Sequence, residues 1–352
     1  MTEVLAARNL VAYYQRPGGG WTHAVDDVTL FLNQGEVLGI AGESGCGKST
    51  LASLLSLTIR PPLSVRGGSL AIDGRQIPIT EDDGQAVTAD LRGTLVSLLP
   101  QYAMNSLNPT QRVRSFVVDV LRSHIPEMTR EEATERARHR LEQLSLPERV
   151  LDAYPHQLSG GMRQRVVAVI STLLNPKILV ADEPTSALDV SSQRALLALL
   201  RRLLGDGIIG SIIFVTHELP VLRHISDRIM VMYAGQLAEI GPTESVISAP
   251  AHPYTTALLN ATLDLETATR SQRIPDFAGA PPDLTDPPAG CRFSPRCPHA
   301  MDKCRRLAPR VIEVRARHEV ACWWVSKNLA TRHYEETGST GALSQGPRPQ
   351  ET

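Results

Sequence analysis

One nine-residue stretch constrains the fold of this chain more than any other feature. Residues 42–50 read G-E-S-G-C-G-K-S-T and directly follow the apolar run 35–41. Glycines let successive backbone N–H groups turn inward around a polyphosphate, while the lysine adds positive charge and the next hydroxyl can bind Mg²⁺. The pattern predicts a phosphate-binding loop between a strand and a helix over 48–57. The residues predicted to contact nucleotide here are Gly42, Ser44, Gly45, Cys46, Gly47, Lys48, Ser49 and Thr50.

The sequence around the loop argues against the alternative of a glycine-rich turn without function. Residues 177–181 and 211–216 are continuous apolar runs of strand length, typical of central parallel strands buried on both faces. The fold class predicted is therefore α/β. Ligands of open α/β sheets bind at the carboxyl ends of the strands. We therefore expect one crevice to collect the loop and four further side chains: Gln101, Asp182, Glu183 and His217.

Two interpretations, one catalytic and one purely structural, are open for the side chains at these strand ends. Asp182 would hold Mg²⁺, in part through water, and Glu183 would polarise the attacking water. Alone, the two carboxylates could merely cap a neighbouring helix. His217 by itself would more often be a satisfied core histidine, but a strand end favours a hydrogen bond to the γ-phosphate.

Composition narrows the class of protein. The 352 residues include 36 basic and 37 acidic side chains, so the net charge of −1 gives no reason to expect a nucleic-acid partner. No apolar run approaches the ~20 residues of a membrane span, and Met1-Thr2-Glu3 is not expected to begin a signal peptide. We expect a soluble globular protein that meets a membrane only through partner subunits.

The order of patterns along the chain predicts its organisation. Strands are expected over 4–11, 24–32 and 95–99, with a hairpin over 229–240. Residues 1–245 would form one nucleotide-binding domain with a helical subdomain at about 105–171, in which Thr129 and Glu132 form a capping box. A short helix is expected over 254–261. Residues 246–330 would form an extension, and the Gly-, Ser- and Pro-rich residues 331–352 a disordered tail.

Four of the five cysteines cluster in the extension, at spacings of five, six and seventeen intervening residues: Cys291, Cys297, Cys304 and Cys322. In a reducing compartment a metal site is the better default than a disulfide framework. The spacings lack the paired C-x-x-C of common structural zinc sites, which weakens zinc without excluding it. A zinc site, an iron–sulfur cluster and four reduced, metal-free thiols all remain open at this point.

Taken together, the motifs of 4–240 closely resemble those of the ATPase subunits of ABC transporters. The resemblance implies that Tyr14 stacks on adenine, whereas the residues alone allow equally a core tyrosine. It makes 42–50 the Walker A loop, Gln101 the Q-loop glutamine and 158–164 the signature motif. Asp182 and Glu183 then end Walker B, 186–189 form the D-loop and His217 is the switch histidine. The predicted Mg²⁺ ligands are Ser49, Gln101 and Asp182, and the predicted signature contacts to ATP are Ser159, Gly160 and Gly161.

Residues 251–259 and 290–301 resemble the carboxyl-terminal extension of oligopeptide- and dipeptide-import ATPases. This resemblance implies that Cys291, Cys297, Cys304 and Cys322 bind one 4Fe-4S cluster. One departure follows Gln101, where Tyr102-Ala103-Met104 replaces the acidic residue and proline usual in these importers. The departure affects the contact expected with the membrane subunit rather than hydrolysis.

The resemblance also implies the partners. ATP would lie between this chain and a second ATPase subunit, a homologue or an identical chain. Two membrane permease subunits would hold the pair at the cytoplasmic face, and a substrate-binding protein would act indirectly.

Other functions remain as alternatives. Within transport, the cargo could be nickel, glutathione or an oligosaccharide. The other classes are a soluble ABC ATPase of DNA repair or translation, against which the extension argues, and a metal-sensing regulator, which would need neither Glu183 nor His217.

Overall fold

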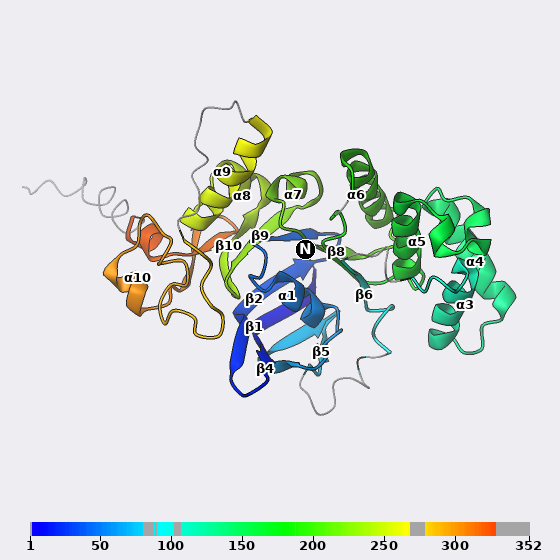
Figure 1. Cartoon of the computed structure of the whole chain (residues 1–352), viewed down its shortest axis with the longest axis horizontal. Helices are drawn as coiled ribbons and strands as arrows, with labels where there is room; N and C mark the ends of the chain where they lie inside the picture. Colours follow the sequence, from blue (N-terminus) through cyan, green and yellow to red (C-terminus); the bar gives the residue numbers. More distant parts are fainter. Residues whose placement is uncertain are drawn as a thin grey trace, which may run out of the picture.

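The computed structural model describes residues 2–79, 88, 90–101, 107–186, 188–267 and 279–328. Two sheets organise these residues (Figure 1). The smaller is antiparallel, with strand order β2-β1-β4-β5. Its strands are β1 (Glu3–Gln15), β2 (Trp21–Asn33), β4 (Leu63–Ile72) and β5 (Arg75–Ile77).

The larger sheet has eight strands in the order β11-β12-β10-β9-β3-β8-β7-β6. Neighbours from β9 to β6 pair in parallel, and the remaining pairs are antiparallel. The predicted α/β class and the β9–β10 hairpin are therefore confirmed. The strands are β3 (Val37–Ala41), β6 (Val96–Leu99), β7 (Ile178–Asp182), β8 (Ser211–Val215), β9 (Arg228–Tyr233), β10 (Gln236–Pro242), β11 (Val311–Arg315) and β12 (His318–Ala321).

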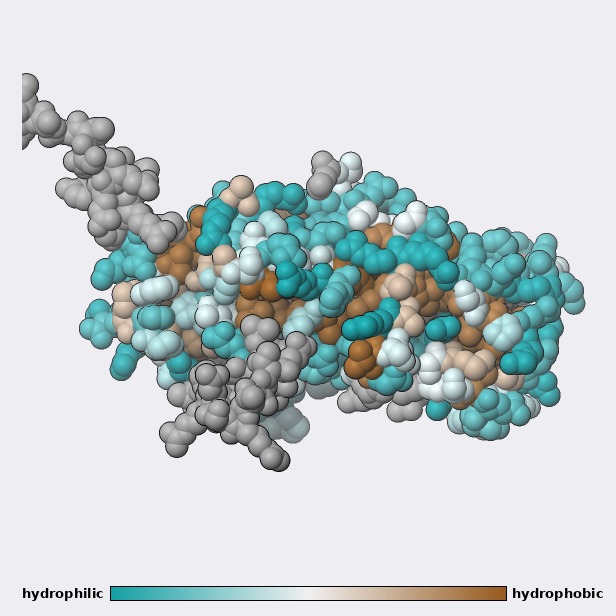
Figure 2. All heavy atoms as spheres, turned by 90° about the horizontal axis from the view of Figure 1, so that it is seen from above, coloured by the Kyte–Doolittle hydropathy of each residue, from teal (hydrophilic) through white to brown (hydrophobic). Residues whose placement is uncertain are grey.

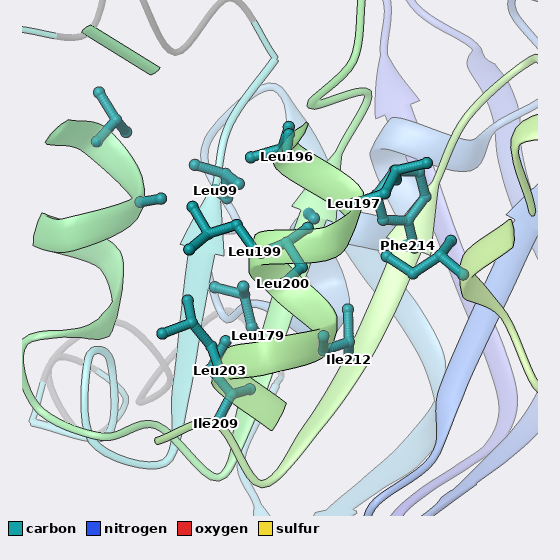
Figure 3. Close-up of a cluster of buried hydrophobic side chains, with 14 of the residues drawn as sticks. Leu99, Leu179, Leu196, Leu197, Leu199, Leu200, Leu203, Ile209, Ile212 and Phe214 are labelled. Carbon is teal, nitrogen blue, oxygen red and sulfur yellow. The ribbon is translucent and has the colours of Figure 1, made fainter. Parts of the chain in front are cut away.

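The central strands feed two cores, because successive side chains of a strand point to opposite faces. Leu179 of β7 lies in one hydrophobic cluster, and its neighbour Val180 in the other. Figure 3 shows the first cluster, in which leucines of one helix, including Leu200, pack against Leu179 and Phe214 of the sheet. Burial on both faces explains why these strands read as continuous apolar runs.

Helices cover both faces of the large sheet. The phosphate loop leads into α1 (Lys48–Leu55), whose leucines belong to the second cluster. In Figure 1, α3, α4 and α5 gather at one end of the molecule and α10 lies at the opposite end. The remaining helices, in chain order, are α3 (Val113–His124), α4 (Arg130–Gln143), α5 (Gly160–Thr172), α6 (Val190–Gly205), α7 (Leu219–Ile225), α8 (Thr243–Ser248), α9 (Pro253–Thr267) and α10 (Asp302–Arg306).

Local sequence patterns predicted where several helices and strands lie, but they predicted less well where these elements begin and end. The capping box of Thr129 and Glu132 is present at the start of α4. Strand β1 runs beyond the predicted 4–11, so Tyr14 lies within the strand rather than after it, and α9 is longer than the predicted 254–261. Strands β4, β5, β11 and β12 were not predicted. In β4, Gly68 has φ +95° and a Cβ there would lie 2.6 Å from the Asn9 carbonyl oxygen, so a bulge interrupts its pattern.

Several predictions fall outside the described residues: the departure at 102–104, Ala187 of the D-loop and the tail 331–352. Figure 2 shows hydrophilic side chains over much of one face, with hydrophobic atoms visible mainly along its middle. Within the described ranges no helix combines the length and apolar character required to cross a bilayer.

Candidate nucleotide site

A cavity of about 590 Å³ opens where the phosphate loop meets the ends of the central strands. Most of the side chains predicted to meet nucleotide line it together. Ser186 of the predicted D-loop also lines it, as do three residues that the sequence did not single out: Thr22, Ala24 and Leu284. The predicted residues among its lining are Tyr14, Ser44, Gly45, Gly47, Lys48, Ser49, Thr50, Gln101, Glu183 and His217.

The phosphate loop packs tightly against its surroundings. Gly47 has φ +102°, and a Cβ there would lie 2.0 Å from the Ala24 carbonyl oxygen, so only glycine fits. Lys48 Nζ donates to the carbonyl oxygens of Gly42 at 2.7 Å and Glu43 at 2.9 Å. These bonds hold the ammonium group against the loop. No side chain caps the N-terminus of α1, so its first N–H groups remain available to an anion.

Asp182 and Ser49 form the part of the site that suits Mg²⁺. Ser49 Oγ donates to Asp182 Oδ1 at 3.2 Å. Burial raises the pKa of Asp182, and the hydrogen bond from Ser49 opposes that rise. A carboxylate beside a hydroxyl is an oxygen donor set of the kind that Mg²⁺ prefers, so these two residues fit the ion.

Glu183 stands at the centre of a hydrogen-bonded group. Gln101 Nε2 donates to its Oε2 at 3.0 Å, and His217 Nδ1 lies 3.4 Å from its Oε1. Its backbone has φ +44°, an uncommon value for a non-glycine residue. The Ser186 backbone N–H and hydroxyl both donate to the Glu183 carbonyl oxygen and hold that conformation. Strain of this kind is often kept at functional positions.

Tyr14 reaches the site from β1. Its hydroxyl lies 3.2 Å from Thr50 Oγ1, and its side chain lines the cavity. The neighbouring Tyr13 points elsewhere: it donates to Asp26 Oδ1 at 2.6 Å and stacks on His23. Stacking of Tyr14 on adenine stays a prediction.

Other predicted contacts do not line this cavity. Ser159 caps α5 by accepting from the Met162 N–H at 3.3 Å, and neither Gly160 nor Gly161 is among the lining residues. Gly42 and Asp182 are not among the lining residues either, but each accepts a hydrogen bond from one of them: Gly42 from Lys48 and Asp182 from Ser49. Within the loop, the Cys46 side chain is buried in the second hydrophobic cluster, and this burial raises the pKa of its thiol.

The four clustered cysteines are free thiols that lie near one another. The Cys291 N–H donates to the Cys304 carbonyl oxygen at 2.7 Å. The pKa of Cys291 is raised to about 11, chiefly by burial and further by the neighbouring Cys304, Cys322 and Cys297. Among the described residues, however, no group of three His, Cys, Asp or Glu side chains is placed to hold a metal ion.

Comparison with known proteins identifies the family. Residues 25–186 match the ABC transporter family, and 238–304 match the oligopeptide/dipeptide transporter C-terminal region. The chain is also 38% identical over 327 residues to the oligopeptide transport ATP-binding protein OppD of Bacillus subtilis (strain 168), covering 92% of this chain and 89% of the relative. The chain belongs to the ATP-binding subunits of the oligopeptide/dipeptide ABC transporter family.

Other relatives agree with this membership. The di/tripeptide transport ATP-binding protein DppF of Pseudomonas aeruginosa (strain UCBPP-PA14) is 37% identical over 92% of this chain and 98% of its own length. The dimeric structure of MJ0796, a bacterial ABC transporter cassette, is 27% identical with a TM-score of 0.58, over 68% of this chain and 98% of that chain. The fold of this ABC subunit is therefore that of the ATPase cassette, and it is an ATP-hydrolysing enzyme by family.

Sequence reasoning missed part of the support of this ABC cassette. Tyr254 and Arg296 contact Glu43 of the phosphate loop, although their positions in the sequence predict no such contact. The available signal was their place in the two stretches, 251–259 and 290–301, that resemble the importer extension.

Proposed function

We propose that this chain binds and hydrolyses ATP to power the import of dipeptides or oligopeptides through an ABC transporter. Two observations together carry the proposal. Phosphate-loop residues, Gln101, Glu183 and His217 line one cavity, and relatives that match most of this chain are named as peptide transport ATP-binding proteins. Both observations are needed, because the cavity supports the binding of ATP, whereas only the names of the relatives support peptides as the cargo.

The geometry supports the following roles for the predicted site residues. Lys48 and the N-terminal N–H groups of α1 bind and orient the phosphates. Ser49, Gln101 and Asp182 would hold Mg²⁺, which neutralises phosphate charge when bound. Glu183 accepts a proton from the attacking water and orients it. Gln101 and His217 keep the Glu183 carboxylate in place, and His217 can turn toward the γ-phosphate. Tyr14 would stack on adenine.

The site needs a partner chain. Ser159, Gly160 and Gly161 begin α5 and do not line the cavity of their own chain. We propose that they close the ATP site of a second cassette, which in turn supplies the same residues here. The dimeric MJ0796 cassette supports this arrangement. The pair, identical or homologous, would work beneath two permease subunits at the cytoplasmic face of the membrane, with a binding protein delivering cargo.

We also propose the chain's organisation: an ATPase domain over 1–245, with a helical subdomain at about 105–171, and an extension over 246–330 followed by a tail over 331–352. In the extension, Cys291, Cys297, Cys304 and Cys322 would ligate one 4Fe-4S cluster. What supports this proposal is that four free thiols lie near one another in a stretch that resembles the importer extension, and that four thiolates are the usual ligand set of such a cluster.

Reconstitution tests the cargo. The chain, co-purified with its membrane subunits and placed in proteoliposomes, should drive ATP-dependent uptake of a labelled dipeptide or tetrapeptide. Lys48→Ala, which removes the phosphate-binding ammonium group, should abolish uptake while the complex still assembles. Uptake of Ni²⁺, glutathione or an oligosaccharide in place of peptides would overturn the peptide assignment and keep the ATPase assignment.

Anaerobic purification tests the cluster. The expected preparation is brown, with broad absorption near ~400 nm and about four irons and four sulfides per chain. Cys297→Ser with Cys304→Ser should lose both colour and iron, and Cys46→Ser, outside the extension, should keep them. A colourless preparation, with stoichiometric zinc or with no metal, would contradict the cluster.

A further inference from the structure

Contacts from the extension reach the back of the phosphate loop. The guanidinium group of Arg296 donates to both carboxylate oxygens of Glu43, at 2.8 Å and 3.0 Å. The Arg296 side chain is only 5% exposed and that of Glu43 is 20% exposed. A bidentate ion pair fixes the orientation of the carboxylate as well as its position. The second residue of the loop is therefore held by a residue 253 positions later in the chain.

The same loop residue is held a second time, through its backbone. The hydroxyl of Tyr254, a fully buried residue of α9, accepts a hydrogen bond from the Glu43 N–H at 2.8 Å. The Tyr254 ring packs on Tyr233 and Phe293, with ring centres 4.6 Å and 5.5 Å apart. Arg296 also donates to the Tyr233 hydroxyl at 3.1 Å. Side chain and backbone of Glu43 are thus both attached to one aromatic cluster.

A third contact supports the middle of the loop. Arg292 binds the Asp26 carboxylate and the Ala234 carbonyl oxygen. Beside Ala234, the Gly235 N–H donates to the Cys46 carbonyl oxygen at 2.8 Å. The turn between β9 and β10 therefore links the extension to the centre of the phosphate loop.

We propose that Arg296 and Tyr254 are positioning residues of the ATP site, through which the extension sets the nucleotide affinity of its own subunit. Lys48 Nζ bonds to the carbonyl oxygen of Glu43, so a displacement of Glu43 also displaces the ammonium group that meets the phosphates. The two residues hold this geometry before nucleotide arrives, which lowers the ordering cost of binding. The inference rests on the proposed assignment of 42–50 as the ATP site and requires no metal at the cysteines.

The test is a titration of the full-length chain with a fluorescent ATP analogue and Mg²⁺, which yields Kd and the number of sites. Arg296→Gln should raise Kd about tenfold, because the charge-assisted pair behind the loop is lost. Tyr254→Phe keeps the ring and loses the hydroxyl, and should raise Kd about threefold. Arg296→Lys keeps the positive charge but cannot donate to both carboxylate oxygens in the same way. Its Kd should lie between those of Arg296→Gln and the unsubstituted chain. Arg305→Gln, the same change at an exposed arginine of the extension, is the matched control and should bind normally.

Three further readouts separate positioning from general damage. A merely structural loss would lower the number of binding sites at unchanged Kd, and that result would overturn the proposal. Glu43→Gln combined with Arg296→Gln should bind no more weakly than Arg296→Gln alone, whereas additive losses would contradict a shared contact. Lys48→Ala should bind hardly at all. Normal binding by that variant would refute the ATP-site assignment itself, while normal binding by Arg296→Gln and Tyr254→Phe would refute only the positioning role.

Discussion

Two glutamate–histidine pairs in this molecule differ in almost every physical respect. Glu239 of β10 and His318 of β12 are both 0% exposed, with 2.6 Å between His318 Nε2 and Glu239 Oε1. Glu183 and His217 lie in the ATP cavity 3.4 Å apart, and the His217 side chain is 45% exposed. The first pair joins the extension to the large sheet, whereas the second faces the space where phosphate would bind.

The difference shows what each pair can do. Glu239 accepts from His318 and from the backbone N–H groups of Ala251 and His252, so its bonds are complete. Burial alone would raise the pKa of Glu239, but these hydrogen bonds lower it overall. Glu183 has one donor in Gln101 and a loose contact to His217. A buried pair whose carboxylate accepts several hydrogen bonds holds one structure, whereas an open pair can change partners during turnover.

Removing the cavity carboxylate should have the largest effect. Glu183→Gln is expected to lower ATP turnover of the assembled transporter by about a thousandfold, because the water loses its base. Nucleotide binding should persist and the ATP-bound paired state should accumulate. Steady-state hydrolysis and size-exclusion chromatography with ATP measure the two effects. Near-normal turnover would remove Glu183 from the mechanism and would leave no functional difference between the two pairs.

Removing the buried carboxylate should act on stability instead. Glu239→Gln leaves a single acceptor oxygen for three donors and turns an NH₂ group toward one of them, which should cost about 3 kcal/mol of the free energy of unfolding. Denaturant unfolding followed by circular dichroism measures the loss. Glu319→Gln, at an exposed position of the neighbouring strand β12, is the control and should change little. Equal stability of both variants would show that the buried pair contributes nothing.

The sequence predicts the cavity pair far better than the buried one. Strand ends and the glycine pattern of 42–50 are local signals, and the parallel sheet brings them together by topology. Glu239 and His318 are 79 positions apart, and β12 was not predicted at all. The one available hint is the isolated acidic residue in the apolar run of β10, since a buried carboxylate needs partners.

The contacts of Arg296 could not be predicted from the sequence, because they also join residues far apart in the chain. With 36 basic and 37 acidic residues, a sequence offers far too many possible charge pairs to choose one. Only packing of the extension on β9 and β10 selects Glu43 as the partner of Arg296. The sequence could therefore predict the surface of the phosphate loop that faces nucleotide, but not the surface that faces the extension.

Acid should lower the free energy of unfolding through the buried groups around Glu239. His252 is fully buried beside Glu239, and burial lowers its pKa to about 4. The folded state keeps this imidazole neutral while the unfolded chain binds a proton below about pH 6.5. Stability should therefore fall as the pH drops from 6.5 toward 4, by about 2 kcal/mol at pH 5. Denaturant unfolding at pH 7 and pH 5 measures the loss, and His252→Gln should reduce the difference between them. A pH-independent free energy of unfolding across this range would contradict the burial argument.

The smallest effect is expected at the cavity histidine, when stability rather than activity is measured. His217→Ala removes a half-exposed ring whose contacts to Glu183 and Glu218, at 3.4 Å and 3.8 Å, are long. Solvent screens such a pair, so the free energy of unfolding should change by less than about 0.5 kcal/mol. Hydrolysis in the assembled transporter should nevertheless fall, because the γ-phosphate would lose the hydrogen-bond donor proposed for it. A loss of stability as large as that of Glu239→Gln would mean that both pairs are structural, and His217 would then be the satisfied core histidine that its residue type alone suggests.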